Sequence, residues 1–560
     1  MTVEGASPST AIPVVLRLAT HVWERLGGTS SSPTAAAKGR EVPGTLIIAA
    51  LGAIVGIVAT IVFWRAGWLL LYSDAQSHLV IARRVVDSQN SGFQQLGTVW
   101  LPMPHILLLL FVQNFAMWQS GLSGALLGTV CLSVSAGALW RIAFRVGFNR
   151  AQRLVTVAVF LLNASILYLS TTALTEPVLI ATLLCAIAGL SGWITAMPAV
   201  SPGELAVFAG LPTAAAVLSR YEGWAFVAVG SVFVIIASWR RWRSMSYTLI
   251  LVFSFVAAPV VAIMWWLVYN YVRYGDPLDF ARGQYSAAVQ QSELADLGLL
   301  PTKGNLGLAV RTFNWSVGDV VGPAVLIIAA VGVFGMLWMR ATSTTALILW
   351  MPAFIYPFAL LGLYVGQTAI RNDASLPTGT FNIRFAAGLV PFVALMVGAA
   401  VGLAFHRGRG AGLAAAWLAF AVVVGSAAWS LSDAQPRMGV VREGFVNSAG
   451  RTDASDAARW LGDHYEGGYI LIDDVSSNTL MSLGLPLDQL YASFNGDAYE
   501  EALADPYKFV DYVFADTASE GDRVWQAISK DPNFGSRFYP VYEAGNYTVW
   551  QNTRRLGPIS

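Results

Sequence analysis

The sequence is poor in charged residues. Asp, Glu, Lys and Arg together make up 12% of its 560 residues, about half of the roughly 25% that soluble globular domains carry. Hydrophobic residues make up 56%, and the mean hydropathy is +0.57. These proportions exclude an ordinary soluble globular protein and predict a polytopic membrane protein.

Three further absences narrow the function classes. The only cysteines, Cys131 and Cys185, lie inside apolar runs, which argues against a disulfide framework or a cysteine metal cluster. The formal net charge is +1, so charge gives no reason to expect a nucleic acid partner. No glycine-rich phosphate loop follows the apolar run 469–475, and nucleotide binding is therefore unsupported. We expect neither a cofactor nor a metal site.

The sequence is instead rich in long apolar runs. A run of about 17–25 residues is long enough to cross a bilayer as a helix. We place eleven such spans near residues 45–71, 121–144, 152–170, 174–196, 204–219, 224–239, 246–268, 317–339, 344–366, 385–405 and 411–431. The run near 204–219 is short, and the orientation below depends on it.

Basic residues predict how the spans are oriented. They gather in the amino-terminal tail and in alternate loops, which the positive-inside rule assigns to the cytoplasm. The clusters are Lys38 and Arg40; Arg141, Arg145, Arg150 and Arg153; Arg240, Arg241 and Arg243; Arg340; and Arg407 and Arg409. The long polar loops 73–120, 269–316 and 367–384 then lie outside, together with the carboxyl terminus. We predict a plasma membrane protein that works on its outer face.

Composition divides the chain into three parts. They are a disordered cytoplasmic tail over 1–43, a transmembrane domain over 44–431 and an extracytoplasmic α/β domain over 432–560. In the last part, strand-like runs occur at 469–475 and 511–517, and a hairpin is predicted to turn at Gly545-Asn546. The predicted fold class is an all-α polytopic membrane protein with a small carboxyl-terminal α/β domain, whose role is structural or acceptor-binding.

The first outer loop concentrates polar residues between the first two spans. Asp74 follows the end of an apolar run and His78 comes at i+4, so a helix would place both on one face. A second, apolar face suits a helix at the membrane surface. Pro102 and Pro104 interrupt the loop, and His105–Trp118 is apolar but too short to span. We predict two interfacial helices joined by a polar crossing.

This layout resembles the GT-C superfamily of membrane glycosyltransferases, in which two surface-parallel helices form the first outer loop and an acidic residue follows the first span. Four short motifs also fit that family. They are Thr175-Glu176-Pro177, Ser219-Arg220-Tyr221-Glu222-Gly223-Trp224, Tyr274-Gly275-Asp276-Pro277 and Asn382-Ile383-Arg384-Phe385. The resemblance covers roughly residues 45–430.

The resemblance implies a GT-C fold, a polyprenyl-phosphate sugar as the donor and Asp74 as the catalytic base. Many relatives show paired acids or an acid-x-acid pattern, whereas Ser73-Asp74-Ala75 offers a single acid. This departure argues against a metal-dependent mechanism. By family analogy, the Ala-, Gly- and Val-rich composition suggests mannose or arabinose transfer in an actinobacterial envelope.

The chemistry of such a transfer determines which groups the site needs. The acceptor hydroxyl must lose a proton as it attacks the anomeric carbon, which calls for a carboxylate, and Asp74 is the candidate. Negative charge builds on the departing phosphate, which calls for fixed positive charge. Arginine suits this role because its planar fork can bind two phosphate oxygens. The predicted substrate-binding residues are His78, His105, Glu176, Arg220, Glu222, Arg273 and Arg384.

Each candidate also has a purely structural interpretation. Asp74 could only cap the helix Ala75–Ser88, and Glu176 could only complement a helix dipole. Arg220 and Glu222 could form a local ion pair. Arg384 could anchor lipid headgroups by snorkelling.

Three function classes remain open at this level. The first is a glycosyltransferase whose acceptor is a glycan, a lipid or a protein. The second is a transporter or lipid flippase, which predicts internal repeats and polar groups near the bilayer midplane. The third is a non-catalytic envelope assembly protein, which has no need of a buried acid in its first outer loop. We favour the first, because the polar residues gather at one predicted surface.

Overall fold

The computed structural model describes residues 41–195, 201–283, 286–376, 379–449, 452–473 and 477–555. Residues 1–40 of the predicted tail lie outside this range. The chain forms two compact units. Among the described residues, the first unit contains 41–56, Val130–Leu167 and Thr175–Asp433, and the second unit contains Ile57–Thr129, Tyr168–Leu174 and 434–555. Each unit is described by itself below.

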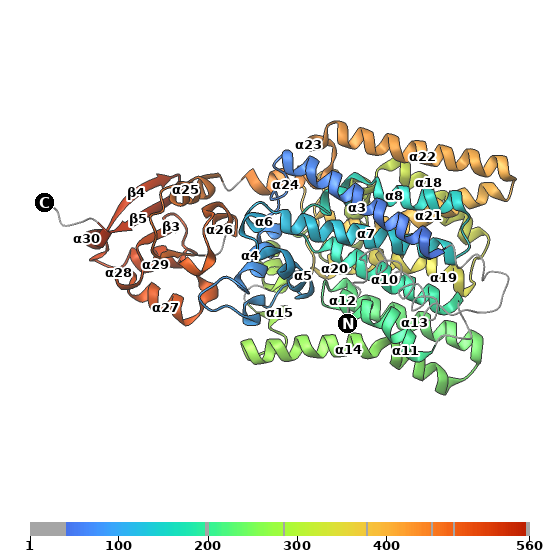
Figure 1. Ribbon diagram of the computed structural model, residues 1–560, viewed down its shortest axis with the longest axis horizontal. Helices are drawn as coiled ribbons and strands as arrows, with labels where there is room; N and C mark the ends of the chain where they lie inside the picture. The colour runs from blue at the N-terminus through green and yellow to red at the C-terminus, as the bar shows by residue number, and fades with distance from the viewer. Residues whose placement is uncertain are drawn as a thin grey trace, which may run out of the picture. The chain divides into compact units, whose positions relative to one another are not determined.

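Apolar helices dominate the described residues (Figure 1). Eight are long and apolar enough to cross a membrane, judged by length and composition alone. They are α3 (Glu41–Arg65), α7 (Leu122–Arg145), α10 (Glu176–Thr195), α13 (Glu222–Trp242), α14 (Met245–Tyr274), the α19–α20 segment (Thr344–Val365), the η4–α21 segment (Ile383–Phe405) and α22 (Arg409–Ser432). A ninth span would be formed by α17 (Leu306–Val321) and α18 (Pro323–Trp338) together, and the chain bends by 110° between these two helices.

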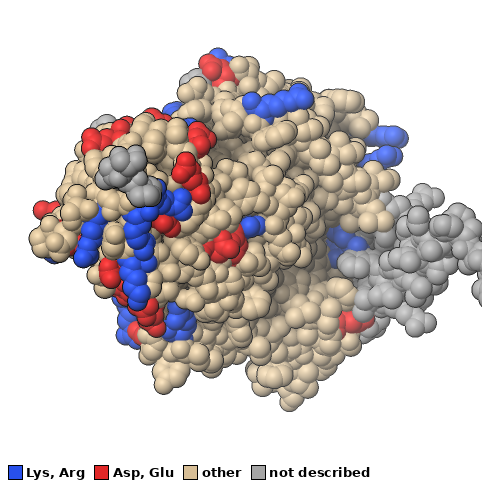
Figure 2. All heavy atoms as spheres, turned by 60° about the vertical axis from the view of Figure 1, so that its left-hand side comes forward, with Lys and Arg blue, Asp and Glu red and all other residues tan. Residues whose placement is uncertain are grey.

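Large apolar side chains are exposed along several of these helices, including α3, α14 and α22. Lipid tails would cover such surfaces in a membrane, where a helix that is apolar all round is stable. Figure 2 shows one face of the molecule, on which Lys, Arg, Asp and Glu gather over the carboxyl-terminal segment and are sparse elsewhere. The prediction of a multi-pass membrane protein is confirmed.

The expected count of eleven spans falls to eight or nine, because two expected spans are shorter helical stretches. Residues 152–170 form α8 (Arg150–Leu161) and α9 (Ala164–Leu169). The break lies at Asn163, whose side chain accepts a hydrogen bond from Ile166 N at 2.9 Å and donates one to Val320 O at 2.9 Å. Asparagine competes with helical hydrogen bonds in this way. The run near 204–219 is a helical stretch over Pro202–Val217, which is short for a span.

The first polar loop of the second unit contains the two expected helices with different bounds. They are α4 (Ser73–Arg84) and α5 (Met103–Val112). Pro102 and Pro104 lie at the cap and first turn of α5, where a missing N–H costs no helical hydrogen bond. The predicted helix His105–Trp118 is interrupted at Asn114, which caps the short α6 (Phe115–Gln119) by accepting a hydrogen bond from Met117 N.

The carboxyl-terminal segment contains a five-stranded sheet in the order β2-β1-β3-β5-β4. Its strands are β1 (Ile470–Ile472), β2 (Leu490–Tyr491), β3 (Tyr512–Asp516), β4 (Phe538–Ala544) and β5 (Tyr547–Asn552). The first three are parallel, and the predicted hairpin joins β4 to β5 through Gly545, whose φ is 56°. Its main helices are α24 (Gly439–Ala449), α25 (Thr452–Asp463), α26 (Ser477–Leu483), α27 (Asp497–Ala504) and α29 (Arg523–Ile528). The predicted α/β fold of this segment is confirmed.

Hydrogen bonds within the second unit tie this segment to the loop that carries Asp74. Three side chains after α4 donate to backbone carbonyls of the segment: Gln89 to Leu490 O at 3.1 Å, Asn90 to Asn495 O at 2.6 Å and Gln95 to Phe494 O at 3.1 Å. At the other end of α4, Ser73 N donates to Asn447 Oδ1 at 3.0 Å. The segment therefore holds α4 at both ends.

Candidate active site

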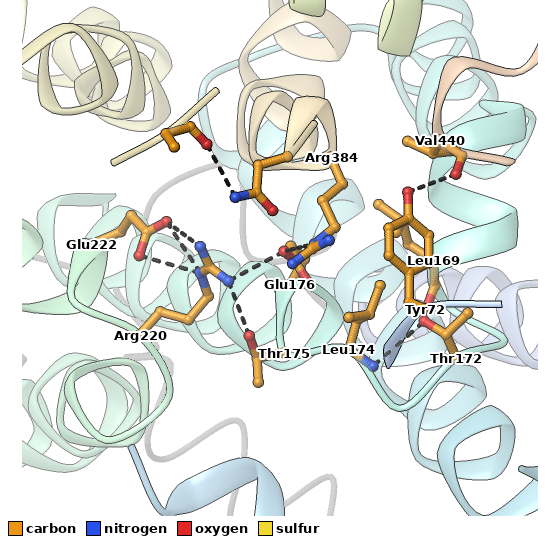
Figure 3. A network of polar contacts seen from close by, with 12 residues as sticks. Tyr72, Leu169, Thr172, Leu174, Thr175, Glu176, Arg220, Glu222, Arg384 and Val440 are labelled. Carbon is orange, nitrogen blue, oxygen red and sulfur yellow. Dashed lines mark hydrogen bonds and ion pairs between the residues drawn. The ribbon is translucent and has the colours of Figure 1, made fainter. Parts of the chain in front are cut away.

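Four charged side chains meet in the first unit at the ends of helices. Glu176 and Glu222 are the first residues of α10 and α13. Arg220 lies in the turn between α12 (Leu211–Val217) and α13, and Arg384 lies in η4 (Ile383–Leu389). Figure 3 shows these side chains pointing toward one another.

Arg220 links the two carboxylates. Its Nη1 donates to Glu176 Oε1 at 3.1 Å and to Thr175 Oγ1 at 3.0 Å. Its other two nitrogens donate to the Glu222 carboxylate at 3.0–3.2 Å, which is the planar, two-oxygen recognition that arginine favours. The Nε of Arg384 donates to the same Glu176 Oε1 at 3.2 Å. One oxygen of Glu176 therefore accepts from both arginines.

Two members of the network are deeply buried, the other two are partly exposed, and the charges balance. Glu176 and Arg384 are 3% and 4% exposed, and the two glutamates offset the two arginines. Burial alone would lower the pKa of Arg220, but the carboxylates of Glu222 and Glu176 outweigh that effect and raise its pKa. The ring of Phe385 lies 4.5 Å from Arg220 Cζ and 5.3 Å from Arg384 Cζ. Pairing is what makes these buried charges tolerable.

One carboxylate oxygen of this network lacks a partner. Within the described part of the chain, the buried Oε2 of Glu176 has no hydrogen-bond partner. An unsatisfied buried acceptor is costly and rare. This oxygen is therefore the atom of the network that is suited to accept a hydrogen bond from a hydroxyl group of a ligand.

Of the five predicted site residues in the first unit, the structure brings four together and leaves Arg273 apart. Arg273 is exposed in the last turn of α14, with its guanidinium over the neighbouring Tyr274 ring at 5.8 Å. The ion pair between Arg220 and Glu222 is present, as its structural interpretation required. The low exposure of Arg384 does not fit headgroup snorkelling.

Asp74 lies in the second unit, in the first turn of α4. The helix begins at Ser73 and its N-cap is Tyr72, so Asp74 is not the capping residue that its structural interpretation required. Its side chain is half-buried. The Tyr72 hydroxyl donates to Val440 O at 2.6 Å and thereby fixes the chain just before the helix.

The two histidines of the first polar loop contact each other across α4 and α5. His78 Nδ1 lies 2.8 Å from His105 Nε2. Both rings are buried, with exposures of 2% for His78 and 0% for His105. Burial, with smaller contributions from His78 and Arg84, holds the pKa of His105 well below its usual value. His105 is therefore neutral at physiological pH.

Comparison with solved structures identifies the fold. ArnT from Cupriavidus metallidurans in the apo state matches with a TM-score of 0.50 and 15% sequence identity, over 90% of this chain and 99% of ArnT. The chain has the GT-C fold. The fold class predicted from the first polar loop and the apolar spans is thus confirmed.

Two further structures are similar to this chain. ArnT bound to undecaprenyl phosphate matches with a TM-score of 0.50, 14% identity and coverage of 90% and 99%. The oligosaccharyltransferase of Archaeoglobus fulgidus matches with a TM-score of 0.47, 13% identity and coverage of 90% and 73%. No protein-family model and no curated protein sequence matches the chain.

Sequence reasoning missed two arginines that hold the first polar loop of the second unit in place. Arg83 Nη1 donates to Val112 O at 2.7 Å and Gln113 O at 2.9 Å, at the carboxyl end of α5. Arg84 Nε donates to Gln95 O at 2.7 Å. The signal was two basic residues in the last turn of a short helix, but their partners are 11 to 30 residues away in sequence.

No group of three or more His, Cys, Asp or Glu side chains converges among the described residues in a way that could hold a metal ion. The two histidines face each other, and the two glutamates of the network face arginines. Metal-independent transfer remains a prediction from the single acid at Asp74.

Proposed function

We propose that this protein is a membrane glycosyltransferase that moves a sugar from a polyprenyl-phosphate donor to an acceptor hydroxyl, with Asp74 as the general base. The observation that carries the proposal is the GT-C fold shared with ArnT, whose structure with undecaprenyl phosphate supports a lipid-linked donor here. The acceptor is a glycan, a lipid or a protein of the envelope.

Asp74 provides the proton acceptor in this mechanism. Asp74 lies in the first turn of α4, where the helix dipole favours a negative charge, and in this proposal it takes the proton of the attacking hydroxyl. The hydrogen bonds at both ends of α4 restrict the movement of this helix. A base held in place lowers the entropy cost of reaching the transition state.

Arg384 is the candidate for the departing phosphate. Its Nε is the nitrogen that pairs with Glu176, and arginine remains charged at every physiological pH. Arg220 holds Glu222 and Glu176, and its main role is to fix the network. Glu176 Oε2 is the candidate acceptor for a hydroxyl of the donor sugar, because it has no partner among the described residues.

The predicted orientation, with the long loops and the carboxyl-terminal domain on the outer face of the plasma membrane, is part of this proposal and needs the short stretch Pro202–Val217 to return the chain across the membrane. Glu176 and Glu222 begin the helices on either side of this stretch and both pair with Arg220, which supports such a return. Since phosphate is a good leaving group, the mechanism uses no general acid. Mannose and arabinose are the first donor sugars to test, on the family analogy given above.

A transporter or flippase is the main alternative. It calls for polar groups near the middle of broken spans. Glu176 and Glu222 instead start their helices, which places the charged network at helix ends and favours the transferase.

Product analysis separates the three function classes. The purified full-length protein, in liposomes with polyprenyl-phosphate mannose or arabinose labelled in the sugar, is expected to move label from the lipid to the acceptor and release polyprenyl phosphate. Movement of intact labelled lipid across the bilayer would indicate a flippase. Label that stays on the lipid and on its original leaflet, with a cell-envelope extract as acceptor source, would contradict both activities.

A further inference from the structure

The second unit contains a hydrogen-bonded pair of histidines, His78 and His105, on the helices of the loop that carries the proposed base. His78 lies on α4 four residues after Asp74, so the two side chains share one face of the helix. His105 lies in the first turn of α5 and is completely buried. A residue with no exposed surface is poorly placed to contact a substrate directly.

Only one of the two facing nitrogens can carry the shared proton. If His78 Nδ1 carries it, then neutral His105 has its own proton on Nδ1. If His105 Nε2 carries it, then neutral His78 has its own proton on Nε2. The two arrangements therefore present different groups to the surroundings.

The surroundings of His105 decide between them. Among the described residues, the buried Nδ1 of His105 has no hydrogen-bond partner. A buried N–H without an acceptor is rarer and costlier than a bare acceptor atom. The first arrangement leaves such an N–H on Nδ1, and the second leaves only a lone pair. A third arrangement, with His105 doubly protonated, is disfavoured because burial lowers its pKa.

We propose that His105 is a positioning residue, whose Nε2–H donates to His78 Nδ1 and fixes the His78 proton on Nε2. His78 then presents a hydrogen-bond donor near Asp74 and cannot act as a base through that nitrogen. This arrangement leaves Asp74 as the proton acceptor and gives His78 a donor role toward an anionic oxygen of the lipid phosphate. The donor role rests on the proposed function, whereas the tautomer does not.

Amide substitutions at His105 test the position of the donated proton. Glutamine places an amide N–H near the position of Nε2, asparagine places one near Nδ1, and phenylalanine keeps the ring without a donor. In the liposome transfer assay, H105N and H105F are expected to lower kcat roughly fivefold to 150-fold, the range of a lost buried hydrogen bond. H105Q is expected to retain most of the rate. Equal rates for H105Q and H105N, or a wild-type rate in H105F, would overturn the positioning role.

Nitrogen NMR of the histidine rings tests the tautomer without any activity. The protein has five histidines, so ¹⁵N-histidine labelling of the full chain gives a small set of ring signals, which H78Q and H105Q assign. The expected result is a protonated Nε2 and an unprotonated Nδ1 on both His78 and His105. A protonated Nδ1 on His78 would overturn the inference. An inactive wild type with the expected tautomers would contradict the proposed function and leave this assignment intact.

Discussion

Each of the two units holds a cluster of buried polar side chains, and the two clusters are stabilised in opposite ways. In the first unit, Glu176, Glu222, Arg220 and Arg384 keep their charges and neutralise one another. In the second unit, His78 and His105 share one proton between two neutral rings. Asp74, which lies on the same helix as His78, is only half-buried.

This difference indicates different consequences of substitution. A buried charge network depends on every member, because removing one leaves another charge unpaired in a medium of low dielectric constant. The loop around Asp74 depends on several neutral hydrogen bonds to backbone carbonyls, each of smaller value. We therefore expect the network to govern stability and the loop to govern turnover.

Removing Arg220 should have the largest effect on stability. R220A leaves Glu222 without its arginine and leaves Glu176 with Arg384 alone. The expected loss is about 3–5 kcal/mol of folding free energy, as for other broken buried pairs. Thermal unfolding in detergent measures it. R282A is the matched control, because Arg282 pairs with Asp276 on the surface at 63% side-chain exposure and should cost about 1 kcal/mol or less. Similar losses in both variants would contradict the comparison.

Arg384 is proposed to bind the phosphate in addition to its role in the network, so its substitution should affect binding. R384K keeps the positive charge but loses the planar fork. It should weaken undecaprenyl phosphate binding by about 1.5–3 kcal/mol, the value of a charge-assisted hydrogen bond. Binding is measured by titration of the purified protein. R311A removes an exposed arginine of α17 and serves as the control. Unchanged affinity in a folded R384K protein would remove Arg384 from the phosphate site.

Weakening the ties between the loop and the carboxyl-terminal segment should affect turnover more than stability. N90A removes the hydrogen bond to Asn495 O, and Q95A removes the one to Phe494 O. Each variant should cost about 0.5–1.5 kcal/mol of stability, and the double variant should lower kcat while KM changes little. A double variant with an unchanged kcat would show that the segment does not support the loop.

The sequence predicted the fold through features that act locally. Apolar length identified most spans, and Gly545-Asn546 marked the hairpin. The break at Asn163 and the 110° bend between α17 and α18 depend on side chains and on packing that a hydropathy average conceals.

Site residues were predictable as candidates but not as partners. Glu176 and Arg384 are 208 residues apart, and Gln89 and Leu490 are 401 apart. Tertiary packing brings such residues together, and single-sequence patterns carry no information on that pairing. The alternative in which Asp74 caps its helix was wrong, because the helix begins two residues earlier than expected.

A smaller effect is expected in the pH dependence of stability. Burial raises the pKa of Asp522 to about 6, against backbone hydrogen bonds from Asp516 and Trp525 that lower it. Its unfolded pKa is about 3.9. Between these values the folded chain binds more protons than the unfolded chain, so this group makes stability fall as pH rises from about 4 to 6. Above pH 6 its contribution is constant. The stability of D522N, measured from unfolding curves between about pH 4 and 6, should lack this decline. A dependence of stability on pH equal to that of the wild type would contradict the role of Asp522.

The most direct test of the central claim is the transfer rate of D74N. Asparagine keeps the size of Asp74 but cannot accept a proton, so sugar transfer from the labelled polyprenyl phosphate should fall by about 10²–10⁴-fold. Folding and undecaprenyl phosphate binding should match the wild type. A D74N protein that transfers sugar at the wild-type rate would contradict the assignment of Asp74 as the base.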